Sequence, residues 1–149
     1  MREKIKNLAK KYHKETIGIR RHLHTHPELS FEEYETSKYV CNFLDKNNIP
    51  YRGGYVKTGV VAHIKGKNPD KKVIALRADM DALPIEETND VSYKSKNKGV
   101  MHACGHDVHT SSVLGVAKIL NELKDDFEGT IKIVFQPGEE LLPGGASLM

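Results

Sequence analysis

The hydrophobic spacing of this chain changes from a helical to a β-strand pattern and back again. Apolar residues recur every three or four positions over residues 3–25, which predicts a first helix. The same spacing predicts a second helix, which follows a capping box formed by Ser30 and Glu33 and ends near Pro50. The expected strands are residues 51–56, 59–65, 72–77 and 130–136, and the expected third helix is residues 111–124. This alternation predicts an α/β fold with helices packed on a sheet, because parallel strands need helical crossover connections.

The length and composition predict one globular domain. The chain has 149 residues, of which 38% are hydrophobic and 29% charged, and its formal net charge is +3. Acidic residues are interspersed among the basic ones, which argues against nucleic-acid binding. No apolar run approaches the ~20 residues that span a bilayer, and the charged start of the chain has no apolar signal region behind it. We therefore expect a cytoplasmic protein without nucleic-acid or membrane partners.

The histidines and cysteines are unevenly distributed. Six of the eight histidines fall in two clusters, at positions 22, 24 and 26 and at positions 102, 106 and 109. The two cysteines, Cys41 and Cys104, are too few for a disulfide framework, and we expect Cys41 to be a small core residue on the second helix. Clusters of histidine with cysteine and carboxylates are typical of metal sites.

Three polar segments follow an apolar run or precede a helix, positions where ligand sites form in α/β sheets. After the third β-rich run, Asp79 and Asp81 are two residues apart. Just before the third helix, Cys104 and His106 flank a glycine, a spacing suited to binding one or two borderline-soft divalent ions. Asp107 follows as a natural acceptor for an imidazole N–H.

The third segment places two adjacent carboxylates, Glu139 and Glu140, after the last β-rich run. Like charges side by side are costly unless a cation separates their roles, so one would bind a metal and the other would act as general base. Together the three segments predict a metal-dependent hydrolase. The absence of a Gly-x-Ser-x-Gly elbow and of Walker or dinucleotide loops disfavours serine hydrolases and nucleotide-binding enzymes. A cysteine with a histidine two residues along is more typical of a ligand pair than of a cysteine protease.

Four ordered motifs resemble those of a known enzyme family. They lie in residues 21–31, 77–84, 102–110 and 136–140 and span nearly the whole chain. With these motifs the chain resembles the aminoacylase/carboxypeptidase-like metallo-amidohydrolases, within them the branch of hippurate hydrolases, N-acyl-amino-acid amidohydrolases and auxin-conjugate hydrolases. The resemblance implies a zinc-peptidase-like α/β/α sandwich catalytic domain. Residues 1–149 would be its N-terminal part, truncated and without the inserted lid and dimerisation domain.

The resemblance also implies an activity. This is hydrolysis of the amide bond of N-acyl amino acids, hippurate-like or N-acetylated, at a centre of two divalent metal ions. Manganese or zinc is expected, with cobalt or nickel as alternatives. The small N-acyl amino acid is the expected partner. The family's lid and dimerisation domain would allow a homodimer of the full-length protein, whose oligomeric state the sequence leaves open.

The resemblance assigns roles residue by residue. The expected metal ligands are Cys104, His106 and Glu140. Glu139 would be the general base that takes a proton from water, and Asp81 would be the acid that supports the metal side. Asp107 and His109 would lie behind the ligands or face the substrate. Asp79 stands where peptidase relatives have a histidine ligand and is left outside the metal-binding set, and the histidines at positions 22, 24 and 26 are expected to be structural.

This chain departs from the family pattern in several places. Two further histidine ligands, one after the Glu-Glu pair and one near the C-terminus of the family, have no counterpart in these residues. The lid domain is also absent, and residues 141–145 replace a more glycine-rich run. We therefore expect weakened or absent activity from residues 1–149 alone, since three strong ligands cannot hold two ions in a closed site.

Three alternatives stay open at this point. They are a non-catalytic metal-binding fragment, a metallo-aminopeptidase or dipeptidase of the same superfamily, and a deacetylase of an N-acetylated biosynthetic intermediate. The Cys-Gly-His-Asp motif disfavours the peptidases, because peptidase relatives use a histidine and a bridging aspartate at the metals. Nothing in the sequence selects one acyl group, one amino acid or one metal.

Overall fold

The computed structural model describes residues 1–149, which form a four-stranded sheet with helices packed against it. The strands are β1 (Tyr51–Tyr55), β2 (Gly59–Lys65), β3 (Val73–Asp79) and β4 (Thr130–Gln136), in the spatial order β1-β2-β4-β3. β4 pairs parallel to β3 and antiparallel to β2, and β1 pairs antiparallel to β2. The sheet is therefore mixed, and β3 and β4 are the parallel neighbours that the alternation of helices and strands predicts.

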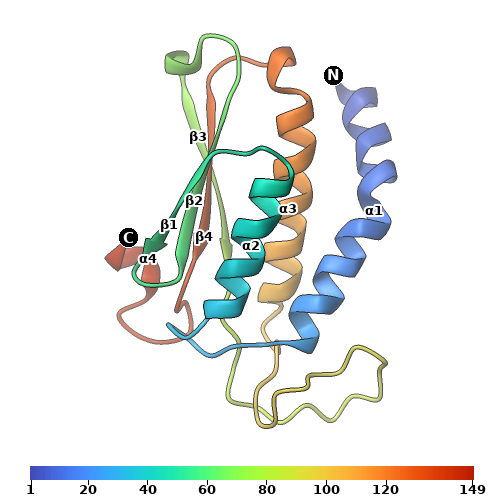
Figure 1. The fold of residues 1–149 in the computed structure, drawn as a ribbon, viewed down its shortest axis with the longest axis vertical. Coiled ribbons are helices and arrows are strands. Elements are labelled where there is room, and N and C mark those ends of the chain that lie inside the picture. Colours follow the sequence, from blue (N-terminus) through green and yellow to red (C-terminus); the bar gives the residue numbers. More distant parts are fainter.

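Three long helices lie together on one side of this sheet (Figure 1). They are α1 (Arg2–Thr25), α2 (Tyr34–Lys46) and α3 (His106–Glu122). α1 packs against α3, α3 contacts β2, β3 and β4, and α2 contacts β1 and β2. Short helical turns complete the structure: η1 (Pro69–Lys71), η2 (Lys124–Asp126) and α4 (Gly145–Leu148). The predicted α/β fold is confirmed, and these residues build two layers of the expected α/β/α sandwich.

The hydrophobic core lies between the helices and the inner face of the sheet. It is one cluster of 15 buried residues. Val60, Ala62 and Ile64 of β2 belong to it, as do Ile133 and Phe135 of β4, following the two-residue period of a strand. Burial of each large aliphatic or aromatic side chain contributes ~1.5–3 kcal/mol, so this layer fixes the strand ends at which the candidate site is built.

The helices are amphipathic. In α1 the buried residues are Ile19, Leu23 and His24, and lysine and arginine side chains lie along its exposed side. None of the helices combines the length and the apolar composition that crossing a bilayer requires.

The predicted bounds agree best where apolar residues define an element. β2 and β4 have the predicted bounds, and α1 begins one residue earlier than predicted. α3 begins at His106 instead of residue 111, because its first turn carries polar residues that hide the apolar spacing. Gly105 precedes this turn in the left-handed region with φ 92°, a conformation that glycine adopts without strain.

The predicted capping box of Ser30 and Glu33 is wrong. α2 has no side-chain hydrogen bond at its N-cap. The Ser30 hydroxyl donates to Asp81 in the loop after β3, and the Glu33 carboxylate accepts hydrogen bonds from other parts of the chain. Glu28 takes over the capping, since its carboxylate accepts two backbone N–H groups in the first turn of α2. Tertiary contacts thus occupy both residues of the predicted box.

Candidate metal centre

Three chain segments meet at the carboxyl ends of the parallel strands β3 and β4. The last residues of these strands, Asp79 and Gln136, are directly paired. The loop after β3 carries Asp81, the loop after β4 carries residues 139 and 140, and α3 begins beside Asp81 at His106. The structure brings together the three polar segments that the sequence singles out, at the edge where ligand sites of α/β sheets form.

Cys104, His106 and Glu140 provide the first group of metal donors. One sulfur, one ring nitrogen and one carboxylate oxygen from these residues all lie within 4.8 Å of one another. His106 Nε2 is 3.7 Å from Glu140 Oε1. Thiolate, imidazole and carboxylate together suit a borderline-soft divalent ion. The three predicted ligands therefore converge, and their donor set fits a transition-metal ion.

His106 also belongs to a second donor group, with Asp79 and His109, whose donor atoms lie within 4.8 Å of one another. His109 Nδ1 is 2.7 Å from Asp79 Oδ1, and His106 Nε2 is 3.6 Å from the same oxygen. The sequence interpretation left Asp79 outside the metal-binding residues, whereas the structure places its carboxylate against two imidazoles. The other Asp79 oxygen forms an ion pair with Arg77 at 2.7 Å, so this carboxylate already has a cationic partner.

Asp81 orients the His106 ring. His106 Nδ1 lies 2.9 Å from the Asp81 backbone oxygen and 3.2 Å from its Oδ1. Both oxygens are acceptors, which places the ring proton on Nδ1 and leaves the Nε2 lone pair available to a metal. Burial raises the pKa of Asp81, but hydrogen bonds led by those from His106 and Ser30 outweigh it, so the pKa lies well below its usual range. This environment keeps the carboxylate ionised, which suits the supporting role expected of it.

The Cys104 thiol is surrounded by negative charge. The pKa of this thiol is raised to about 11, chiefly by a hydrogen bond with Glu140 and further by desolvation and the charges of nearby carboxylates. The protein alone therefore disfavours the thiolate, which is the form that binds metals. A divalent cation would neutralise this excess of negative charge and favour the thiolate, so the electrostatics of the site fit a metal ion.

Glu139 faces the same imidazole as Glu140 but is more exposed. Its Oε2 is 3.8 Å from His106 Nε2, and its Oε1 is 4.0 Å from the Arg77 guanidinium. The Glu139 side chain is 39% exposed, against 23% for Glu140. It lies beyond hydrogen-bond distance of both neighbours, so its oxygens are available to water.

Asp107 is buried in the first turn of α3 and belongs to a charged network. Its Oδ2 is 2.7 Å from His24 Nδ1 and 2.8 Å from Arg20 Nε. The other ring nitrogen of His24 is 3.0 Å from the Glu87 carboxylate. Helix α1 and the segment that contains Glu87 thereby hold the turn that begins with His106.

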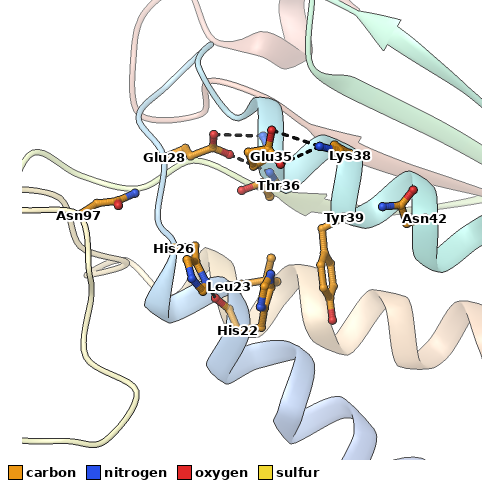
Figure 2. A pocket seen from close by; sticks show the side chains of 10 residues that line it. All are labelled: His22, Leu23, His26, Glu28, Glu35, Thr36, Lys38, Tyr39, Asn42 and Asn97. Atoms are coloured by element: carbon orange, nitrogen blue, oxygen red, sulfur yellow. Dashed lines mark hydrogen bonds and ion pairs between the residues drawn. The ribbon is translucent and has the colours of Figure 1, made fainter.

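The sequence interpretation missed His24 as a partner of this turn, because it treated the three N-terminal histidines as one cluster. The feature that distinguishes His24 from the other two is its place beside Leu23 on the buried side of α1. His22 and His26 instead line a polar pocket of about 350 Å³ between α1 and α2 (Figure 2), where the His22 ring stacks on Tyr39 with centroids 4.4 Å apart. None of the residues that line this pocket belongs to either donor group.

Comparison with known proteins agrees with the resemblance carried by the four motifs. The model of peptidase family M20/M25/M40 matches residues 75–149, which contain both donor groups. The chain is 49% identical over 148 residues to an N-acyl-L-amino acid amidohydrolase of Geobacillus stearothermophilus, covering 99% of this chain and 40% of that protein. It is 50% identical over 136 residues to an N-acetyl-L-cysteine deacetylase of Bacillus subtilis, covering 91% of this chain and 32% of that protein.

The fold leads to the same family. A Bacillus subtilis protein described as a dinuclear metal binding peptidase from the M20 family superimposes with a TM-score of 0.85 and 48% identity, covering 91% of this chain and 38% of that one. The chain thus spans at most 40% of the length of these relatives, all of which are named as hydrolases or peptidases. The matched half of the sequence, the shared fold and the ordered motifs agree, and the chain belongs to peptidase family M20/M25/M40.

Proposed function

We propose that this chain supplies the metal-binding part of the active site of an N-acyl-amino-acid amidohydrolase. One observation carries the proposal: donors of three kinds converge around His106, and the carboxylate of Glu139 faces the same ring. The names of two relatives, an N-acyl-L-amino acid amidohydrolase and an N-acetyl-L-cysteine deacetylase, support cleavage of an amide bond in an acylated amino acid. Residues 1–149 would form the N-terminal part of the catalytic domain, in line with the 40% of the first relative that they match.

Cys104, His106 and Glu140 would hold one divalent ion. The second donor group contains the same His106, whose one free nitrogen, Nε2, can bind a single ion, so Asp79 and His109 of that group would remain for another. The dinuclear site named for the Bacillus subtilis relative supports a pair of ions. We expect manganese or zinc, with cobalt or nickel as alternatives. When bound, such ions supply Lewis-acid activation of water and of the scissile carbonyl.

Glu139 would act as the general base. Its carboxylate would take a proton from the attacking water and deliver it to the leaving amine. The Arg77 guanidinium lies 4.0 Å from the Glu139 carboxylate, so a cation stands beside the group that would take the proton. Asp81 would hold the His106 ring in one orientation while the proton moves, because both of its oxygens near the ring accept from Nδ1.

His109 and Asp107 would act beside the ligands. The His109 side chain is 54% exposed, so it can meet a substrate that enters from solvent. Asp107 is 1% exposed and would anchor the first turn of α3 through His24 instead of touching substrate. The partner of the site would be the small N-acyl amino acid, and association of the full-length protein into a homodimer stays a prediction.

An assay of the full-length protein that contains residues 1–149 tests this proposal, after reconstitution with manganese or zinc, against N-acetyl and N-benzoyl amino acids; residues 1–149 alone are expected to show weakened or absent activity. We expect metal-dependent release of the free amino acid, lost in Glu139→Gln while metal binding is retained. Turnover that survives Glu139→Gln would refute the general base. Metal binding without any turnover would favour a non-catalytic metal-binding fragment, and hydrolysis of unacylated dipeptides alone would favour a metallo-aminopeptidase or dipeptidase. Turnover of N-acetyl substrates alone would favour a deacetylase of an N-acetylated intermediate.

A further inference from the structure

Glu33 is a fully buried carboxylate whose partners are all neutral donors. Its exposed fraction is 0%. The backbone N–H groups of Gly138 and Phe31 donate to Oε1 at 2.7 and 2.9 Å, and the Thr58 hydroxyl donates to Oε2 at 2.6 Å. A buried carboxylate is costly unless hydrogen bonds compensate it, so these donors are what stabilise Glu33 in the interior.

Gly138, the residue before Glu139, has an unusual backbone conformation and lies against the ring of Phe31. Its φ is 56°, in the left-handed region, and a Cβ atom here would lie 2.5 Å from the Phe31 ring. Phe31 is itself left-handed, with φ 63°. One oxygen of Glu33 accepts the N–H of both residues. This carboxylate therefore stabilises two left-handed backbone conformations and keeps the two segments in contact.

Ser30, three residues before Glu33, binds the other acidic loop of the site. Its hydroxyl donates to Asp81 Oδ2 at 2.6 Å, and the same oxygen accepts the N–H of Glu140 at 2.9 Å. The segment between α1 and α2 therefore contacts the loop after β3 through Ser30 and the loop after β4 through Glu33. These are the two loops whose carboxylates surround His106.

We propose that Glu33 is a positioning residue of the metal centre: by holding the Gly138 peptide, it fixes where Glu139 and Glu140 point relative to His106. The inference rests on the proposed function, because Glu33 acts through those two carboxylates. It gives a chemical role to Glu33, for which the sequence predicts only helix capping. The rival explanation is that Glu33 merely joins the start of α2 to the sheet through Thr58.

Two substitutions separate the position of the carboxylate from its charge. Glu33→Asp keeps the charge but shortens the side chain by one methylene, which withdraws the carboxylate from the Gly138 N–H. Glu33→Gln keeps the length and an oxygen that can accept both N–H groups, and its amide nitrogen can donate to the Thr58 hydroxyl. Thr58→Val is the matched control, because it removes the third hydrogen bond and leaves the contact with Gly138 unchanged.

The experiment titrates the protein with Co²⁺ alone and follows the thiolate-to-cobalt absorption, which reports binding through Cys104, together with thermal unfolding. We expect Glu33→Asp to weaken Co²⁺ affinity by about 10- to 100-fold, the range for loss of a group that orients a ligand. Glu33→Gln and Thr58→Val should keep the affinity of the wild type even where their Tm falls. Gly138→Ala displaces the same peptide from Phe31, so it should reproduce the loss and replaces Glu33→Asp if that variant does not fold.

Each contrary result has a distinct meaning. Wild-type affinity in Glu33→Asp or in Gly138→Ala would overturn the inference and leave the metal centre intact. A loss in Glu33→Gln with wild-type affinity in Glu33→Asp would show an effect of charge instead of position, and equal losses in Glu33→Asp and Thr58→Val would show a general structural role. Unchanged Co²⁺ binding in a Cys104→Ala control would refute the proposed metal centre itself, and the inference with it.

Discussion

The Asp81 carboxylate accepts the backbone N–H of Glu140 at 2.9 Å. Its other oxygen lies 3.2 Å from His106 Nδ1, so one side chain holds two proposed ligands that come from different elements. A change at Asp81 should therefore disturb both ligands together.

We expect Asp81→Asn to weaken divalent-metal binding by about 10- to 100-fold, as measured by calorimetric titration. The amide has one acceptor oxygen, whereas the carboxylate accepts on one oxygen from His106 and on the other from Ser30 and Glu140. Ser30→Ala is the matched control, since it removes a single donor to the same carboxylate and should cost less. Equal affinities of Asp81→Asn and the wild type would contradict this prediction.

Substitutions of the two adjacent glutamates, Glu139 and Glu140, should have different effects on catalysis and on metal binding. Glu139→Gln is expected to lower kcat by about 10²- to 10⁴-fold, the usual contribution of a general base, with the metal Kd unchanged. Glu140→Gln should raise the metal Kd, because it removes a carboxylate from the first donor group. Measuring kcat and metal Kd for both variants tests the assignment, and the opposite pattern would mean that the two roles are exchanged.

The buried network around His24 should matter for stability. His24→Ala leaves the Glu87 and Asp107 carboxylates without the imidazole that lies between them, so we expect the free energy of unfolding to fall by about 3 kcal/mol. His22→Ala, two residues earlier on an exposed position of the same helix, should change it by less than about 0.5 kcal/mol. Urea unfolding of both variants measures the difference, and similar losses would show that the network contributes little.

Glu87 should make stability depend on pH in the acid range. Burial raises its pKa, but hydrogen bonds led by those from the Ser95 N–H and His24 outweigh it and lower the pKa to about 2, against an ordinary value of 4.5. A carboxylate with a lowered pKa stabilises the fold fully above its unfolded pKa, and this contribution is lost as the pH falls through the folded pKa. Between pH 4.5 and pH 2 the wild type should therefore lose stability more steeply than Glu87→Gln. Urea midpoints across this range test it, and parallel profiles would count against it.

The sequence predicted features whose signal lies within one short segment. Alternating apolar residues mark both ends of β2 and β4, and the structure has the same bounds. The resemblance to the family motifs implies Cys104, His106 and Glu140 as ligands, and the position of each beside a strand end or a helix start favours the same prediction. The pairing of β3 with β4 then places those ends at one edge of the sheet.

Predictions failed where a contact joins distant segments. Ser30 and Glu33 have the spacing of a local capping box, yet both bind loops far away in the sequence. His24 and Asp107 are 83 positions apart, and no local pattern marks such a pair. The start of α3 was missed for a related reason, since its first turn is built from polar residues that bind neighbouring loops instead of the core.

The place of β4 in the sheet determines the order in which this chain can acquire its structure. β4 is the last strand in the sequence, but it lies between β2 and β3. A growing polypeptide that ends before residue 130 has no strand to join those two. Pairing of distant segments is slow, because the entropy of closing the intervening chain must be lost before the contacts form. During synthesis the loop after β3 and the loop after β4 therefore meet only when this strand inserts, and a metal ion at the proposed centre would stabilise the fold only after that step.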